Sequence, residues 1–143
     1  MLVDETIVTP WGRLKPANPK VAELAKKAKE AFPEAEIRAG AFADEKYLDV
    51  MLRFREPPLQ IYLRPKAIGE EGEVHTPGRE IEITKEELER LKELAKKYGL
   101  EVEGDEHEQF ITKRPVETID EAIESAKRIK EMVSKEKLEW GYW

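Results

Sequence analysis

The stretch LDVMLRFREPPLQIYLR, residues 48–64, alternates apolar and polar side chains on both sides of a proline pair. An alternation of period two is typical of strands with one buried face. The short gap at Pro57-Pro58 favours an antiparallel hairpin between the two runs. This stretch therefore predicts the centre of an antiparallel sheet.

Further extended segments lie on both sides of this hairpin. Residues 37–42 form a candidate first strand, and residues 100–103 and 109–113 form a second candidate hairpin. Residues 79–83 give one more short extended segment that leads into a helix, whereas residues 69–73 are typical of an exposed loop. We therefore expect five or six strands.

Three helices complete the pattern, each with a start signal. Asn18-Pro19 begins the first helix, which ends before Pro33. The capping boxes at 84–87 and 118–121 begin the other two, and Gly99 ends the middle helix. The sequence thus predicts an α+β fold in the order α-β-β-β-(β)-α-β-β-α, with an antiparallel sheet.

The chain has the length of a single domain with one core. We expect this domain to cover residues 1–143, with an N-terminal arm at 1–17, a core at 18–135 and an aromatic tail at 136–143. In the arm, residues 6–8 form a short strand at most, and an irregular segment follows it. The sequence contains no internal repeat.

Charge is the strongest compositional signal, because 39% of the residues are Asp, Glu, Lys or Arg. Thermolabile amides are limited to Asn18, Gln60 and Gln109. This combination is typical of heat-adapted proteins.

The absence of Cys fits a reducing compartment, and no apolar run approaches the roughly 20 residues that cross a bilayer. We therefore expect a cytoplasmic protein without a membrane span.

No residue pattern of catalysis or metal binding stands out. His75 lies in an exposed-looking turn and His107 in a cluster of acids, but neither has the spacing that gathers metal ligands. The serines are in no nucleophile turn, and no glycine-rich loop cradles phosphate. The carboxyl groups of Asp44, Glu45 and Asp49 lie near the central hairpin. Two such groups can serve as general acid and general base only where burial drives their pKa values apart. The sequence predicts no catalytic residue, metal or cofactor.

Basic residues on the polar side of the hairpin are the best candidates for binding an anion. Strand parity places several of them on one sheet face, together with an aromatic ring. The alternative is a solvated face whose bases pair with nearby acids. The net charge of −6 argues against a general nucleic-acid binder. The candidate residues are Arg53, Arg55, Tyr62, Arg64 and Lys66.

Aromatic residues at both ends of the chain are candidates for a protein interface. They lie outside the periodic elements, although Trp and Tyr are enriched at interface hot spots. The alternative is that the arm and the tail dock on their own domain. The candidate interface residues are Trp11, Trp140, Tyr142 and Trp143.

The order of elements over residues 18–135 looks like that of the type III secretion chaperone-like superfamily. It has a leading helix, a three-stranded meander over 37–63, a helix at 84–98, two strands, and a closing helix at 118–133. The resemblance rests on topology and assigns no functional residue. The segment 79–83 departs from it, and the arm and tail have no counterpart. The resemblance implies a non-enzymatic, often dimeric domain that holds a partner protein.

Three functions remain open. The sequence favours a non-catalytic protein–protein interaction or chaperone-like domain, whose partner is another protein or a second copy of the chain. The first alternative is an anion- or RNA-binding domain that uses the basic sheet face. The second alternative is a small enzyme with a carboxylate/His site.

Overall fold

The structure is a computed structural model that describes residues 7–9, 12–14, 19–39, 50–64 and 72–140. In chain order its elements are β1 (Ile7–Thr9), β2 (Gly12–Leu14), α1 (Pro19–Ala31), β3 (Glu36–Ala39), β4 (Val50–Arg55), β5 (Pro58–Arg64), β6 (Glu73–His75), α2 (Lys85–Lys97), β7 (Glu101–Gly104), β8 (Gln109–Lys113) and α3 (Ile119–Lys135).

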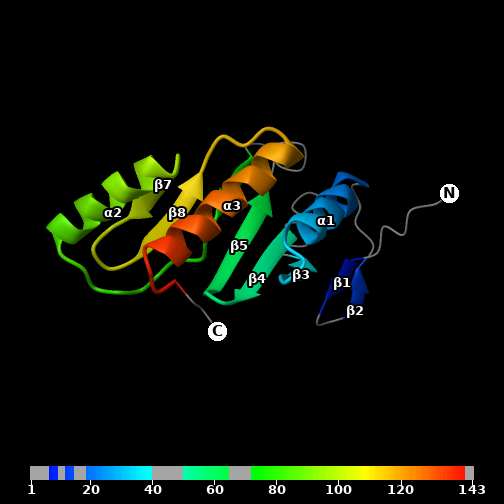
Figure 1. The fold of residues 1–143 in the computed structure, drawn as a ribbon, viewed down its shortest axis with the longest axis horizontal. Coiled ribbons are helices and arrows are strands. Elements are labelled where there is room, and N and C mark those ends of the chain that lie inside the picture. Colours follow the sequence, from blue (N-terminus) through cyan, green and yellow to red (C-terminus); the bar gives the residue numbers. More distant parts are fainter. Residues whose placement is uncertain (1–6, 10–11, 15–18, 40–49, 65–71, 141–143) are drawn as a thin grey trace.

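One six-stranded sheet organises the fold, with strand order β3-β4-β5-β6-β8-β7 and every neighbouring pair antiparallel. The three helices pack on one face of this sheet (Figure 1), and their apolar side chains join those of the strands in a single core. The predicted α+β fold with an antiparallel sheet is confirmed.

The central hairpin forms as its alternation predicts. β4 pairs with β5, and Leu52 lies opposite Ile61. The alternate apolar side chains from Val50 to Phe54 and from Leu59 to Leu63 point toward the helices and are fully buried. Except for Met51, the side chains between them are more accessible. Burying a side chain of this size contributes about 1.5–3 kcal/mol, so this strand pair is a main source of stability.

The helix signals have the expected effects, with one difference. The Thr84–Glu87 capping box has both of its hydrogen bonds, and Gly99 follows α2 with a φ of 71°. At α3, the Thr118 hydroxyl accepts a hydrogen bond from the Glu121 N–H, but the Glu121 carboxylate accepts one from the Glu117 N–H. The start of α3 is therefore an N-cap without the reciprocal bond of a capping box.

The fourth strand lies earlier in the chain than the sequence indicated. β6 occupies 73–75, in the stretch read as a loop and turn, and pairs with both β5 and β8. The segment 79–83 forms only an isolated bridge, between Arg79 and Gln109. A three-residue strand is too short to show a period of two, which explains the misplacement.

The N-terminal arm also contains more regular structure than expected. β1 and β2 form a separate two-stranded antiparallel hairpin, and β1 lies near β3. The expectation of an irregular segment after residue 8 was therefore wrong for 12–14. The remaining arm residues, Trp11 among them, lie outside the described part of the chain.

Within the residues that the structure describes, no helix has the length and apolar character needed to cross a membrane.

Candidate functional site: the helix-free face of the sheet

The sheet face opposite the helices carries polar and aromatic side chains from all six strands of the sheet. Side chains alternate between the two faces of a strand, so the residues between the core positions all point to this face. We call it the helix-free face. Its members include Glu36 of β3, Met51, Arg53 and Arg55 of β4, Gln60, Tyr62 and Arg64 of β5, Glu73 and His75 of β6, Phe110 and Thr112 of β8, and Glu101 and Glu103 of β7.

An aromatic pair lies at the centre of this face. Tyr62 and His75 are cross-strand neighbours, and their rings stack with centroids 5.3 Å apart and planes at 19°. The Nδ1 atom of His75 is 3.0 Å from the Thr76 carbonyl oxygen. A carbonyl oxygen only accepts hydrogen bonds, so this contact is a hydrogen bond in the tautomer that carries its proton on Nδ1.

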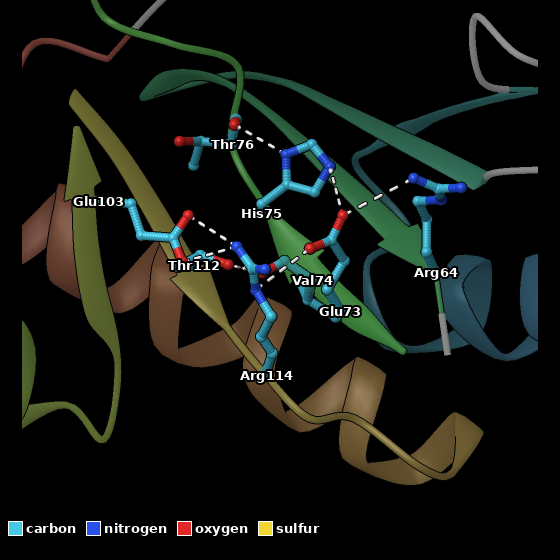
Figure 2. A network of polar contacts seen from close by, with 8 residues as sticks. All are labelled: Arg64, Glu73, Val74, His75, Thr76, Glu103, Thr112 and Arg114. Carbon is cyan, nitrogen blue, oxygen red and sulfur yellow. Dashed lines mark hydrogen bonds and ion pairs between the residues drawn. The ribbon is translucent and has the colours of Figure 1, made fainter. Parts of the chain in front are cut away.

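The Glu73 carboxylate lies between Arg64, His75 and Arg114 (Figure 2). One carboxylate oxygen of Glu73 lies 3.7 Å from Arg64 Nη1 and 3.7 Å from His75 Nε2, and the other lies 3.4 Å from Arg114 Nε. The contacts with Arg64 and Arg114 are ion pairs rather than hydrogen bonds, whereas the contact with His75 is an ion pair only when the imidazole carries both protons. The Glu73 side chain is 22% exposed, so it is held largely inside the network.

Arg114, which follows β8, extends the network to the edge strand β7. Its Nη2 atom donates to both carboxylate oxygens of Glu103, at 2.6 and 2.7 Å. The partners remain 37% and 44% exposed, and ion pairs of this kind contribute at most about 1 kcal/mol. The network therefore positions side chains more than it stabilises the fold.

The helix-free face combines charged and aromatic side chains. In the described part of the chain, no three or more side chains of His, Asp or Glu gather in a way that holds a metal ion. The face presents fixed guanidinium donors, carboxylate acceptors and aromatic rings on a rigid sheet.

The predicted anion-binding residues come together only in part. Strand parity places Arg53, Arg55, Tyr62 and Arg64 on the helix-free face, and Lys66 lies outside the described residues. Arg55 lies near the β4–β5 turn, opposite Pro58, whereas Arg64 lies at the other end of β5, opposite Glu73. The cations are therefore spread along the face rather than aimed at one point.

The sequence did not reveal the centre of the network. Glu73 and His75 fell in the unrecognised strand β6, and Arg114 lies 11 residues from its partner Glu103. The only signal was the pattern of polar, apolar and polar side chains at 73–75, which is too short to identify a strand.

Trp140, one of the predicted interface residues, packs inside its own chain. It is 3% exposed, its indole N–H donates to the Pro77 carbonyl oxygen at 3.2 Å, and the Arg79 guanidinium lies 4.2 Å from its ring centroid. For Trp140 the structure shows docking on the same domain. Trp11, Tyr142 and Trp143 lie outside the described residues.

His107 is in a surface turn, away from the helix-free face network. Its Nδ1 atom is 2.7 Å from the Glu82 carboxylate, and its backbone N–H donates to Asp105. The hydrogen bond and the negative charge of Glu82 raise the pKa of His107. Backbone hydrogen bonds from His107 and Glu108 lower the pKa of Asp105. With its side chain 71% exposed, His107 is a solvated turn residue.

Replacing Glu82 by Gln should lower the pKa of His107, because the main cause of its elevation is removed. A raised folded pKa means that the His107–Glu82 pair stabilises the fold below the ordinary His pKa of 6.5, and that this contribution disappears as the pH rises through the folded value. A proton NMR titration of the His107 ring measures the shift. Glu80→Gln is the matched control, and an equal midpoint in both variants would show that Glu82 is not the cause.

Comparison with known proteins gives no relative: no family model, curated protein or solved structure matches the chain.

Proposed function

We propose that the protein is a non-catalytic protein-binding domain, and that its partner docks on the helix-free face. The observation that carries this proposal is the composition of the face. The basic residues Arg53, Arg55, Arg64 and Arg114 on this face are all arginines, and the half-buried rings of Tyr62 and Phe110 accompany them.

Arginine, methionine and aromatic residues are the types enriched at protein interfaces, whereas lysine is depleted there. The helices have the opposite composition. Many of their exposed basic residues are lysines, such as Lys26, Lys96 and Lys127. Arginine offers a planar fork of donors and stacks on aromatic rings, which the compact lysine ammonium does not. The difference between the two faces supports a recognition role for the helix-free face.

The balance of charge favours a protein over a nucleic acid. Four carboxylates, of Glu36, Glu73, Glu101 and Glu103, lie among the arginines of this face. A phosphate backbone would meet these carboxylates and lose part of the attraction that drives nucleic-acid binding. A protein surface with both signs of charge pairs with them instead. The resemblance in element order to type III secretion chaperones, which hold partner proteins, supports the same function.

Reversing two charges on the face tests this function. The double variant Arg53→Glu/Arg55→Glu replaces the two arginines of β4 by acids and leaves the core residue Phe54 between them unchanged. We expect the variant to lose at least about 90% of the partner captured from a lysate, because like charges then oppose each other across the interface. The matched control is Lys26→Glu/Lys127→Glu, which reverses two exposed charges on the helices and should retain capture. Urea unfolding of both variants checks that the fold is intact.

Two further measurements separate the alternatives. Light scattering of the wild type and the face variant shows whether the partner is a second copy, since a dimer formed through the face would dissociate in the variant. A gel shift with single-stranded RNA tests the anion-binding alternative. An RNA shift that the face variant abolishes, or capture that both double variants retain equally, would contradict protein binding through this face.

We also propose a heat-adapted, cytoplasmic origin on the basis of composition. The ion pairs of the helices, such as Lys135–Glu131 and Arg128–Glu124, are exposed, and ion pairs of this type help most at high temperature.

A further inference from the structure

A cleft of about 510 Å³ lies between α2, the segment before it and the segment after α3, apart from the helix-free face. Its apolar lining includes Ile81, Ile83, Leu94 and Leu138. Clefts of roughly 300–1,000 Å³ that combine an apolar lining with a few polar groups are the usual sites of small ligands. The volume of this cleft falls in that range, and the cleft is a wide surface groove rather than an enclosed cavity.

Ile81 is the most exposed apolar side chain of this cleft. It is 37% exposed, and no other large hydrophobic residue is exposed among the residues whose side-chain burial is described, 23–37, 50–64 and 72–140. Its segment is held in place, because Arg79 exchanges two backbone hydrogen bonds with Gln109 and the Ile83 N–H donates to the Glu106 carbonyl oxygen. The exposed side chain is thus presented by a fixed segment.

Arg79 places a positive charge beside this apolar lining. Its guanidinium lies against the Trp140 ring, and its Nε donates to the Gln109 side-chain oxygen at 3.1 Å. Desolvation lowers the pKa of Arg79, while the charges of Glu139 and Glu87 raise it. Among the described residues, no carboxylate lies within ion-pair distance of this guanidinium. A partly desolvated cation without an ion pair attracts an anion.

Two further bases and two acids complete the charged lining. Arg90 on α2 and Lys137 after α3 add positive charge, and Glu87 and Glu139 offset part of it. With Arg79, the bases outnumber the acids. This excess suits one negative charge on a ligand, and the two acids disfavour a ligand that carries several.

We propose that this cleft binds an amphipathic monocarboxylate, such as a short fatty acid. The carboxylate accepts hydrogen bonds from the Arg79 guanidinium and pairs with Arg90. The hydrocarbon part covers Ile81, Ile83, Leu94 and Leu138. This activity is separate from the proposed protein binding, because the two surfaces are built from different elements.

Titration of the full chain with octanoate tests the proposal by methyl NMR. We expect saturable shifts of the Ile81, Ile83, Leu94 and Leu138 methyl signals, and much smaller shifts with octanamide, which has the same tail without the charge. Arg90→Gln should weaken octanoate binding about tenfold, because a charge-assisted contact is lost. Arg79→Gln should weaken it at least as much, but this change also removes a structural hydrogen bond, so Arg90→Gln is the deciding variant.

Arg128→Gln is the matched control, since Arg128 is an exposed arginine of α3 that pairs with Glu124 away from the cleft lining. It should leave octanoate binding unchanged. Equal binding of octanamide, or equal effects of Arg90→Gln and Arg128→Gln, would overturn the carboxylate site. The absence of saturable shifts would also overturn it. Nuclear Overhauser contacts from these methyl groups to the rings of Tyr142 or Trp143 would overturn it too, because they would place the end of the chain itself in the cleft.

Discussion

Replacing Gln109 by Leu is expected to lower the free energy of unfolding by about 3 kcal/mol. The Gln109 side chain is fully buried, and its amide donates to the carbonyl oxygens of Ile81 and Asp105 at 3.0 and 2.9 Å. Its oxygen accepts from Arg79. Leucine fills a similar volume but leaves two acceptors and a charged donor without this partner, and unsatisfied buried groups cost about 1–3 kcal/mol each.

Urea unfolding measures this loss as a lower midpoint with an unchanged slope. Gln60→Leu is the matched control, because Gln60 lies on the accessible helix-free face and not in the core. The same substitution there should cost less than about 1 kcal/mol. Similar midpoints for both variants would show that the hydrogen bonds of the Gln109 side chain do not stabilise the fold.

Gly104→Ala should destabilise the protein by about 3 kcal/mol, because the β7–β8 turn requires glycine. Gly104 has a φ of 106°, which side chains rarely tolerate. A Cβ at this position would overlap the backbone oxygen of Glu108, which accepts the turn hydrogen bond from the Asp105 N–H at 2.8 Å. The turn must distort to relieve this overlap.

Gly99→Ala provides the comparison for this effect. Gly99 has a φ of 71°, in the left-handed region, and a Cβ there would meet the end of the flexible Arg128 side chain rather than the backbone. We expect a loss of only about 1 kcal/mol. Thermal unfolding of both variants measures the difference, and equal losses would contradict the steric account of the Gly104 turn.

Local patterns in the sequence predicted most of the fold. The alternation over 48–64 located the central hairpin, and Thr84, Gly99 and Thr118 located helix ends within a residue or so. These signals lie within one element and act through neighbouring backbone groups. For that reason they can be read without knowing the rest of the structure.

The candidate surfaces were harder to predict, because they depend on which strands are neighbours. β6 pairs with β8, while β7 occupies the edge of the sheet. Only this order brings Glu73 next to Arg114 and places Glu103 within reach. The cleft depends in the same way on α2 lying beside the segment after α3, and Gln109 shows its structural role only once its partners are placed.

The central claim is that the helix-free face contacts a protein partner, and photo-crosslinking tests it most directly. A benzoylphenylalanine is placed at position 55 on this face, and in a second protein at position 127 on α3; the native Arg55 and Lys127 are both exposed. After irradiation in a lysate of the source cells, we expect a discrete adduct from position 55 and none from position 127. Where the partner is a second copy, this adduct has the mass of two chains. Adducts from position 127 alone, or equally from both positions, would contradict it.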